Sequence, residues 1–277
     1  MNTLAVLITA ALAGSASEQE TWEESYSFDP DLPPVVQIEN VWGDVTVTTH
    51  NAPTVEFVVE QRRSARDAEW LDRSRDILRL RSFRETDGVT LTMRRRDGEW
   101  EQRRCKQCRL HADIEVRVPA GASVIAGTVN DGAVRVEGVR GTVTATNVNG
   151  PVTVVDAESC DRIASVNGRV KIDFATTPDH ERCTLDTING DMHVALPEDA
   201  HADFRINTNR GKVTSAFELE ASPEPPKLER VSSGKRNQYR LTQGPALRLG
   251  AGGAVFEFES MNGDVSIDRR NPRRNSR

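Results

Sequence analysis

The chain has 277 residues, of which 37% are hydrophobic and 5% aromatic, so it has few large rings to fill a wide globular core. Its 36 basic and 42 acidic residues give a formal net charge of −6, which argues against a nucleic-acid-binding protein. Past the first twenty residues no apolar stretch is long enough to span a bilayer, so we expect no transmembrane span after removal of a leader. A narrow core of Val, Ile and Leu, in one large or two small domains, fits this composition.

Residues 1–17 are predicted to be a signal peptide. Leu4–Ala13 is an apolar run of suitable length, and the small residues from Ala13 to Ser17 supply a cleavage site. The segment before this run lacks Lys and Arg, and the alternative interpretation is a buried N-terminal strand. We therefore expect an exported protein in which residues 18–34 form an acidic linker or edge segment.

Residues 35–127 are predicted to form a strand-rich N-terminal cap with one short helix. The helix is expected between Ser64 and Ile77, where Ser64 and Asp67 resemble an N-cap pair and Trp70 is positioned to pack on the sheet. A repeat array needs a cap because its open end is an unpaired edge. Strands are expected over residues 35–39, 45–48, 55–60, 77–84, 89–96 and 112–118.

Cys105 and Cys108 form a Cys-x-x-Cys pair within the arginine-rich segment 94–109. The pair can be an internal disulfide, as is usual in exported proteins, a redox-active pair, half of a zinc site that uses all four cysteines, or two free thiols. We favour the internal disulfide, because the pair lies between strand-like segments and not at a helix N-terminus. The arginines are interpreted as a solvated strand face, and the alternative is a patch that contacts an anionic surface.

Residues 128–268 repeat a short phrase, Val-Asn-Gly in its clearest copies, followed by an alternating strand. Glycine tolerates positive φ and Asn is the next most tolerant residue, so each copy predicts a turn. Antiparallel hairpins would produce a meander, whereas glycines spaced by roughly nine residues, and later by about twice that, indicate stacked repeats. We therefore expect an all-β fold, a single-stranded parallel β-solenoid (β-helix) with the N-terminal cap and short helix. The repeat turn residues are Gly132, Gly150, Gly168, Gly190, Gly211 and Gly263.

Cys160 and Cys183 provide a check on this register. They lie eight and seven residues before Gly168 and Gly190, so stacking would place them on neighbouring strands about 4.8 Å apart. That separation is within disulfide reach, since bridged Cα atoms are about 4.4–6.8 Å apart. The alternative is two buried free thiols.

Three aspartates, Asp173, Asp186 and Asp191, are the candidates for glycan hydrolysis or Ca²⁺ binding. Aspartate beside glycine is also what such turns require, and no His or Lys accompanies these residues in a repeated register. The five histidines are dispersed and form no metal-ligand spacing. We therefore predict no catalytic residue, no cofactor and no metal site.

The run IEVRVPAGASVIAGTVNDGAVRVEGV, followed by VNGPVTV, SVNGRVKI and TINGDMHVALP, resembles the bacterial putative-adhesin family of β-strand-repeat envelope proteins, a domain of unknown function. The resemblance covers residues 35–268. It implies an export signal or membrane anchor and a β-helix closed by a final strand like Met261–Ile267. It transfers no catalytic residues, and the Cys105 to Cys108 insert is not part of the family pattern.

The function expected from these observations is a non-catalytic structural, adhesion or binding module of the bacterial cell envelope, in the periplasm or on the outer surface. The alternative is a β-helical polysaccharide-active enzyme, a lyase or a hydrolase. The expected partner is an envelope protein or a glycan, and an anionic surface is a further candidate for the Arg94–Arg109 loop. Residues 269–277 are expected to be a basic, disordered tail.

Overall fold

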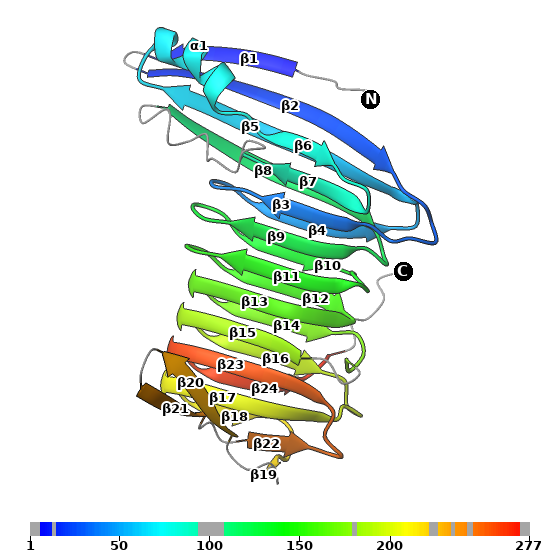
Figure 1. The fold of residues 1–277 in the computed structure, drawn as a ribbon. Helices are drawn as coiled ribbons and strands as arrows, with labels where there is room; N and C mark the ends of the chain where they lie inside the picture. Colours follow the sequence, from blue (N-terminus) through cyan, green and yellow to red (C-terminus); the bar gives the residue numbers. More distant parts are fainter. Residues whose placement is uncertain are drawn as a thin grey trace.

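The computed structural model describes residues 6–12, 15–93, 108–178, 182–221, 227–233, 236–242 and 246–271. Two large sheets, sheet A and sheet B, make up most of this part of the chain and form an elongated tower (Figure 1). In spatial order, sheet A consists of β1 (Val6–Leu12), β2 (Ser15–Ser27), β5 (Thr54–Ala65), β8 (Cys108–Pro119), β4 (Val45–His50), β10 (Val134–Glu137), β12 (Val152–Ala157), β14 (Val170–Phe174), β16 (Met192–Leu196), β24 (Val265–Arg269) and β18 (Val213–Ser215).

Sheet B has the same number of strands, 11, and a single helix is present among the described residues. In spatial order, sheet B consists of β19 (Glu220–Ala221), β22 (Ala246–Leu249), β17 (Ala202–Arg210), β23 (Ala254–Asn262), β15 (Arg182–Asn189), β13 (Ser159–Asn167), β11 (Thr142–Asn147), β9 (Ser123–Thr128), β3 (Val35–Glu39), β7 (Gly88–Thr92) and β6 (Arg81–Arg84). The remaining elements are the two-stranded sheet of β20 (Lys227–Ser233) and β21 (Arg236–Thr242), and helix α1 (Ala68–Ile77).

The expected single-stranded parallel β-solenoid is wrong, because both large sheets are mixed. Strands β1, β2, β5 and β8 pair antiparallel at one end of sheet A. In sheet B, β6 pairs antiparallel with β7, and β22 pairs antiparallel with β17 and β19. A meander does not describe the centre either, where β9, β11, β13 and β15 pair parallel, as do β10, β12, β14 and β16. The repeated phrase governs only this centre, and the ends follow other pairings.

We use the word rung for two consecutive strands, one from each sheet, such as β11 and β12. The order of rungs along the tower departs from the sequence at both ends. The β3–β4 rung lies between β7 and β8 on one side and β9 and β10 on the other. The β23–β24 rung lies between the β15–β16 rung and the β17–β18 rung. The final Asn-Gly-Asp-Val strand is therefore inserted into the stack and does not close it.

The core between the sheets is narrow and aliphatic in the centre. In sheet A, one inward column consists of Val134, Val152, Val170, Met192 and Val265, each fully buried. Burying such a side chain contributes about 1.5–3 kcal/mol relative to exposure. Aromatic rings join the core near β23, where Phe174 and Phe204 pack against Phe256 and Phe204 also contacts Phe258. A second aromatic contact joins Phe57 of β5 to Tyr26.

The antiparallel end has a second, separate core beneath α1, formed by Ala16, Leu71, Leu78, Met93 and Leu110 among others. The short helix was predicted correctly, but it begins later than Ser64, which lies in β5. Asp67 is the N-cap, and its carboxylate accepts a hydrogen bond from the Trp70 backbone N–H at 2.9 Å. Trp70 is half-buried against this core.

A buried ion cluster joins α1 to this end of sheet A. The Glu18 carboxylate accepts from Arg63 Nη1 at 3.0 Å and from Arg75 Nη2 at 2.6 Å. Arg63 also donates to the Leu78 carbonyl at 2.9 Å, at the C-terminus of the helix. Burial lowers the pKa of the Arg63 guanidinium, whereas the hydrogen bond with Glu18 raises the pKa of Arg75. Two cations around one carboxylate compensate for removing that carboxylate from water.

The N-terminal segments enter the fold as strands. Val6–Leu12 forms β1 and pairs antiparallel with Ser15–Thr21, while β2 pairs with β5 along its whole length. Residues 18–34, expected to be a linker or edge segment, thus include most of β2. The signal peptide over residues 1–17 stays a prediction. Residues 94–107 and 272–277, which hold most of the arginine-rich loop and of the basic tail, lie outside the described residues.

Candidate functional site

The repeat turn glycines stack into one column where the chain passes from sheet B to sheet A. We call this region the turn edge. A Cβ placed on any of the six repeat glycines would lie 1.8–2.1 Å from the carbonyl oxygen of the glycine on a neighbouring rung, which is closer than any real contact. A Cβ on Gly43 would lie 2.2 Å from the Ala112 carbonyl oxygen. Glycine is therefore required so that the turns can stack at strand spacing. Following the order of the rungs, the column runs through Gly43, Gly132, Gly150, Gly168, Gly190, Gly263 and Gly211.

Gly141 does not belong to this column. Its missing Cβ faces the Ala122 carbonyl, at the opposite edge where the chain passes from sheet A back to sheet B. The nine-residue spacing between glycines in the sequence thus corresponds to half of a rung. A whole rung takes about eighteen residues. The degenerate copy at Gly141 marks the second turn of the same rung.

Small polar side chains support the glycine column from inside the turn. Thr128 Oγ1 donates to the Gly43 carbonyl at 2.9 Å, and Ser165 Oγ donates to the Gly150 carbonyl at 2.8 Å. On the rung between them, Asn147 Nδ2 donates a hydrogen bond to the Gly132 carbonyl at 2.9 Å. These donors, together with Asn40 Nδ2 at the Gly43 carbonyl, give hydrogen-bond partners to carbonyl groups of the tight turns.

Outside the glycines, asparagine side chains form a continuous hydrogen-bonded ladder, which we call the Asn column. Each Nδ2 donates to the Oδ1 of the Asn on the next rung, at 2.8–3.0 Å. All four bonds have the same direction, and the interior side chains are exposed to solvent. The members of the Asn column are Asn130, Asn149, Asn167, Asn189 and Asn262.

The Asn column has a different residue at each end. At one end, Trp42 forms an isolated parallel backbone β-bridge with Asn130. The guanidinium of Arg109 lies 5.4 Å from the Trp42 ring centroid. At the other end Arg210 is the register partner of Asn262. Asn209, the asparagine of the loosest sequence copy, is therefore one position out of register.

Beside the Asn column runs an aliphatic column formed by the residues that immediately precede it in sequence. Ile188 is 42% exposed and Met261 is 53% exposed. These are large exposures for such side chains, which are usually buried. The other members are half-buried valines. The aliphatic column consists of Val41, Val129, Val148, Val166, Ile188 and Met261.

The three aspartates considered for catalysis do not converge. Asp173 is on β14 in sheet A and pairs with Lys171 at 3.2 Å. Asp186 is on β15 in sheet B and pairs with Arg162 at 2.6 Å. Asp191 lies at the turn edge, where its Oδ1 accepts from the Asp264 backbone N–H at 3.1 Å. Each carboxylate thus has its own partner on a different surface.

A polar cavity of ≈ 350 Å³ lies on the outer face of sheet A, next to the segment that follows β24. Asp173 lines it together with Asp156 and Asp268, neither of which was singled out in the sequence. His193 Nδ1 lies 3.0 Å from Asp268 Oδ2 and 2.8 Å from Ser266 Oγ. Both contacts involve the same ring nitrogen, so this set does not have the geometry of a catalytic triad.

The segment after β24 is held against this cavity by Arg270. Its guanidinium pairs with Asp156 and donates to the Ala175 carbonyl at 3.1 Å. Its backbone N–H donates to the Leu196 carbonyl at 2.7 Å. Every aspartate of the cavity therefore has a cationic or imidazole partner.

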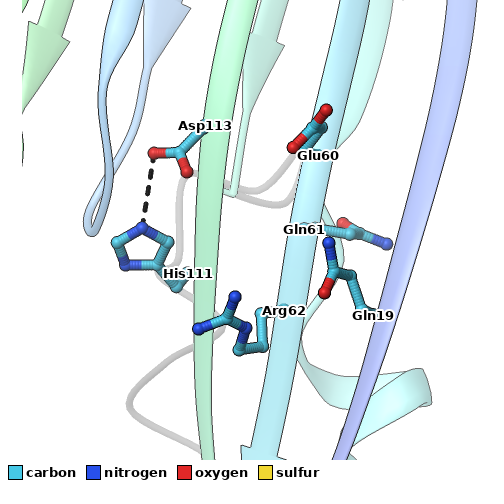
Figure 2. Close-up of a pocket in the computed structure, with 6 residues that line it drawn as sticks. All are labelled: Gln19, Glu60, Gln61, Arg62, His111 and Asp113. Carbon is cyan, nitrogen blue, oxygen red and sulfur yellow. Dashed lines mark ion pairs between the residues drawn. The ribbon is translucent and has the colours of Figure 1, made fainter. Parts of the chain in front are cut away.

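A smaller cavity of ≈ 140 Å³ lies on the outer face of β2, β5 and β8 (Figure 2). His111 and Asp113 form an ion pair of 3.3 Å on β8, and Glu60, Gln61 and Arg62 come from β5. The side chains are polar and of both charges, with no Phe, Tyr or Trp among the lining residues. We assign no chemistry to this cavity.

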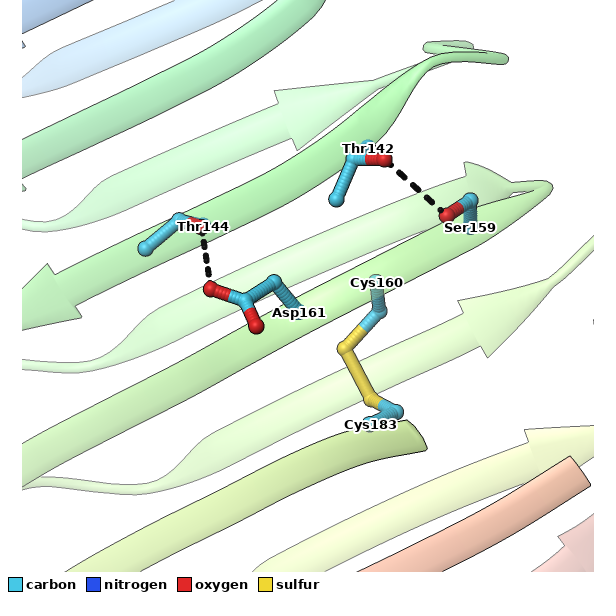
Figure 3. The surroundings of a disulfide bond; sticks show 6 residues. All are labelled: Thr142, Thr144, Ser159, Cys160, Asp161 and Cys183. Atoms are coloured by element: carbon cyan, nitrogen blue, oxygen red, sulfur yellow. Dashed lines mark hydrogen bonds between the residues drawn. A yellow bond between two sulfur atoms is a disulfide. The ribbon is translucent and has the colours of Figure 1, made fainter. Parts of the chain in front are cut away.

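The disulfide expected between Cys160 and Cys183 is confirmed, with the two Cα atoms 5.2 Å apart on β13 and β15 (Figure 3). Both cysteines are 2% exposed, so the bond fastens neighbouring rungs inside the core. On the outer face of sheet B, Thr144 Oγ1 of β11 donates to Asp161 of β13 at 3.2 Å. Cys108 is not a free thiol, but Cys105 lies outside the described residues, so their pairing stays a prediction.

Sequence reasoning located the turn glycines and the disulfide but missed the sheet A cavity. The glycines and cysteines could be found because they recur at the period of the rungs. The cavity residues sit on β12, β14, β16 and β24, and no period links Asp156 to Asp268. Among the described residues, no group of three or more His, Cys, Asp or Glu side chains is placed to bind a metal, and no helix is long and apolar enough to cross a membrane.

No protein-family model matches the chain, and no curated protein matches it. Among solved structures, the chain is similar to the crystal structure of a putative cell adhesion protein from Clostridium sporogenes. The TM-score is 0.43 and the identity 8%, with 90% of this chain and 99% of that chain covered. At this level of similarity, the comparison assigns no family.

Proposed function

We propose that the protein is an exported, non-catalytic binding or adhesion module of a bacterial cell envelope, built as a rigid tower. The observation that carries the proposal is the separation of Asp173, Asp186 and Asp191, each held by its own partner. A glycosidase needs two carboxyl groups facing one bond, about 5–9.5 Å apart, with one of them kept protonated. Carboxylates on three surfaces do not supply that arrangement.

The construction of the stack supports a scaffold role. Its rungs are joined by the glycine contacts, the Asn column and a buried disulfide, all of which restrict movement between neighbouring rungs. Stable disulfides are characteristic of exported proteins, because the cytosol keeps thiols reduced. A rigid, elongated body with polar outer faces is suited to presenting a binding surface away from its attachment point.

A polysaccharide-active enzyme is the second candidate, and the sheet A cavity is what favours it. Asp156, Asp173 and Asp268 line one cavity of ≈ 350 Å³ together with His193. Each of the three carboxylates is already engaged by a cationic or imidazole partner of the protein. The scaffold role is therefore the one that we propose.

Two measurements test this proposal. Fractionation of native cells, followed by non-reducing peptide mapping, should place the protein outside the cytoplasm with Cys160 joined to Cys183. Incubation with a panel of soluble polysaccharides should release no new reducing or unsaturated ends. Release that is abolished by Asp173→Asn or Asp268→Asn, but not by the surface change Asp161→Asn, would replace the binding module with an enzyme that uses the sheet A cavity.

A further inference from the structure

We propose that the turn edge is a binding track for an uncharged linear glycan that lies along the tower. This inference rests on the proposed function, because it names the partner and the surface of the binding module. The track combines the Asn column, the aliphatic column beside it and Trp42 at one end.

The Asn column has hydrogen-bonding capacity left over. A side-chain amide has two N–H donors and an oxygen with two lone pairs. Within the ladder, Asn149, Asn167 and Asn189 each donate one bond and accept one. One N–H and one acceptor site therefore remain on each amide, and these side chains are exposed. Paired donors and acceptors of this kind match the hydroxyl groups of a sugar, which both donate and accept.

The ladder also fixes the geometry of these groups before any ligand arrives. Each amide is oriented by bonds of 2.8–3.0 Å to its neighbours on both sides. A preorganised array loses little conformational entropy on binding, and this loss is a main cost of association. Neighbouring amides are one strand spacing of about 4.8 Å apart, so the five asparagines span about 19 Å. Such a row fits an extended polymer better than a single small molecule.

The aliphatic column supplies the second half of the recognition. Pyranose rings carry apolar C–H groups on their faces, and Ile188 and Met261 offer apolar surface that is 42% and 53% exposed. Trp42 continues the line of the Asn column and is half-buried. Aromatic rings have one large apolar face and a polar handle, which suits contact with a sugar ring.

Charge on the turn edge points to an uncharged polymer. The Asn column itself carries no charge, and basic residues lie at its two ends, Arg109 over the Trp42 ring and Arg210 beside Asn262. The position that follows each glycine of the column holds Asp44, Arg169, Asp191, Lys212 and Asp264 on different rungs, together with alanine and proline. Acidic and basic side chains in similar numbers create no strong positive field that would attract a polyanion. A neutral polysaccharide is therefore the occupant that the surface favours.

The test uses the full-length processed protein with chitohexaose and cellohexaose as neutral probes, and polygalacturonate as the charged one. Affinity is measured by isothermal titration calorimetry. Ile188→Glu places a charge on the track without removing any ladder bond, and we expect it to weaken binding of the neutral probe at least tenfold. Ile125→Glu is the matched control, because Ile125 is 40% exposed on β9 but lies five residues before Asn130, away from the turn edge. We expect this control to bind within twofold of the wild type.

A second variant, Asn167→Ala with Asn189→Ala, removes the amides, and Asn207→Ala is its control at an exposed position of β17 off the column. The double change should also weaken binding at least tenfold, with a melting curve recorded to show that the protein is folded. Equal affinity of the wild type and both track variants, no binding of either neutral probe, or binding of polygalacturonate alone would each overturn the track. Hydrolysis of a probe would instead contradict the non-catalytic function, and so the two failures are distinguishable.

Discussion

The parallel centre and the antiparallel N-terminal end of the tower are stabilised in different ways. In the centre, the same contact recurs on every rung: glycine on glycine, amide on amide, and valine on valine. At the N-terminal end, each contact occurs once, as in the Glu18, Arg63 and Arg75 cluster under α1. Repetition makes the centre visible in the sequence, and single contacts make the other end specific but hard to predict.

From this comparison we expect that substituting a glycine of the central column causes the largest loss of stability. In Gly168→Ala the new Cβ would lie 2.1 Å from the Gly150 carbonyl oxygen, and backbone atoms cannot move aside without separating two rungs. We expect a loss of more than about 4 kcal/mol in the free energy of unfolding, a size reserved for severe core or backbone conflicts. Urea denaturation followed by circular dichroism measures it.

Gly121→Ala is the matched control for that change. Its Cβ would first meet the Pro33 ring at 3.2 Å, outside the column, so we expect a loss of less than about 1 kcal/mol. Similar stabilities for the two variants would contradict the role of the glycine column.

At the antiparallel end, the largest expected effect comes from the buried ion cluster. Arg63→Met leaves Glu18, whose side chain is 3% exposed, with Arg75 as its remaining cation. Breaking a buried pair costs about 3–5 kcal/mol, and we expect about 3 because Arg75 stays in place. Arg66→Met, at an exposed pair with Asp67, should cost less than about 0.5 kcal/mol.

If Glu18→Gln combined with Arg63→Met were no more stable than Arg63→Met alone, the cost would not arise from an uncompensated carboxylate. Chemical denaturation of Arg63→Met, Arg66→Met and the double variant, measured in parallel, gives the three free energies of unfolding for this comparison. A restored stability in the double variant is the expected outcome.

The disulfide is a single contact within the repetitive centre. Cys160 and Cys183 are 23 residues apart, and a loop of this size corresponds to about 3 kcal/mol in the chain-entropy account. Because the neighbouring rungs are also held by the glycine and Asn columns, we expect the double change to Ala to cost about 2–3 kcal/mol without loss of the fold. In reductant, the wild type and this variant should have the same denaturation midpoint, and without reductant the wild type should have the higher one. An unfolded variant would show that the bridge, and not the columns, holds the rungs.

The same contrast explains how much could be predicted. Val166-Asn167-Gly168 shows its turn directly, because the turn chemistry and strand alternation are local. Pairing between distant segments is not local, and nothing in Met261–Ile267 shows that β23 and β24 insert beside β15 and β16 instead of closing the stack. The antiparallel pairing of β2 with β5 also escaped prediction, because the apolar positions that pack on the core, Trp22, Tyr26 and Phe28, are set among acidic residues.

The candidate site divides in the same manner. The asparagines of the turn edge were identified as turn residues, but hydrogen bonds between their side chains depend on the register of five strands. The sheet A cavity depends on where Arg270 lies after the inserted rung, so its residues have no common sequence signal.

The smallest expected effect is the pH response of α1. The Asp67 carboxylate accepts from the Trp70 N–H, and this bond holds its pKa below the usual 3.8. A carboxyl group with a depressed pKa contributes stability that is present above its unfolded value and lost as the pH falls through the folded value. Hydrogen exchange at the Trp70 amide should therefore become less protected below pH 3.8, with little change in global stability. Asp67→Asn is the control, because the Asn side chain keeps a capping oxygen but does not titrate. In this variant the protection of the Trp70 amide should not change across the same pH range. If the variant lost as much protection as the wild type, a group other than Asp67 would be responsible for the pH response.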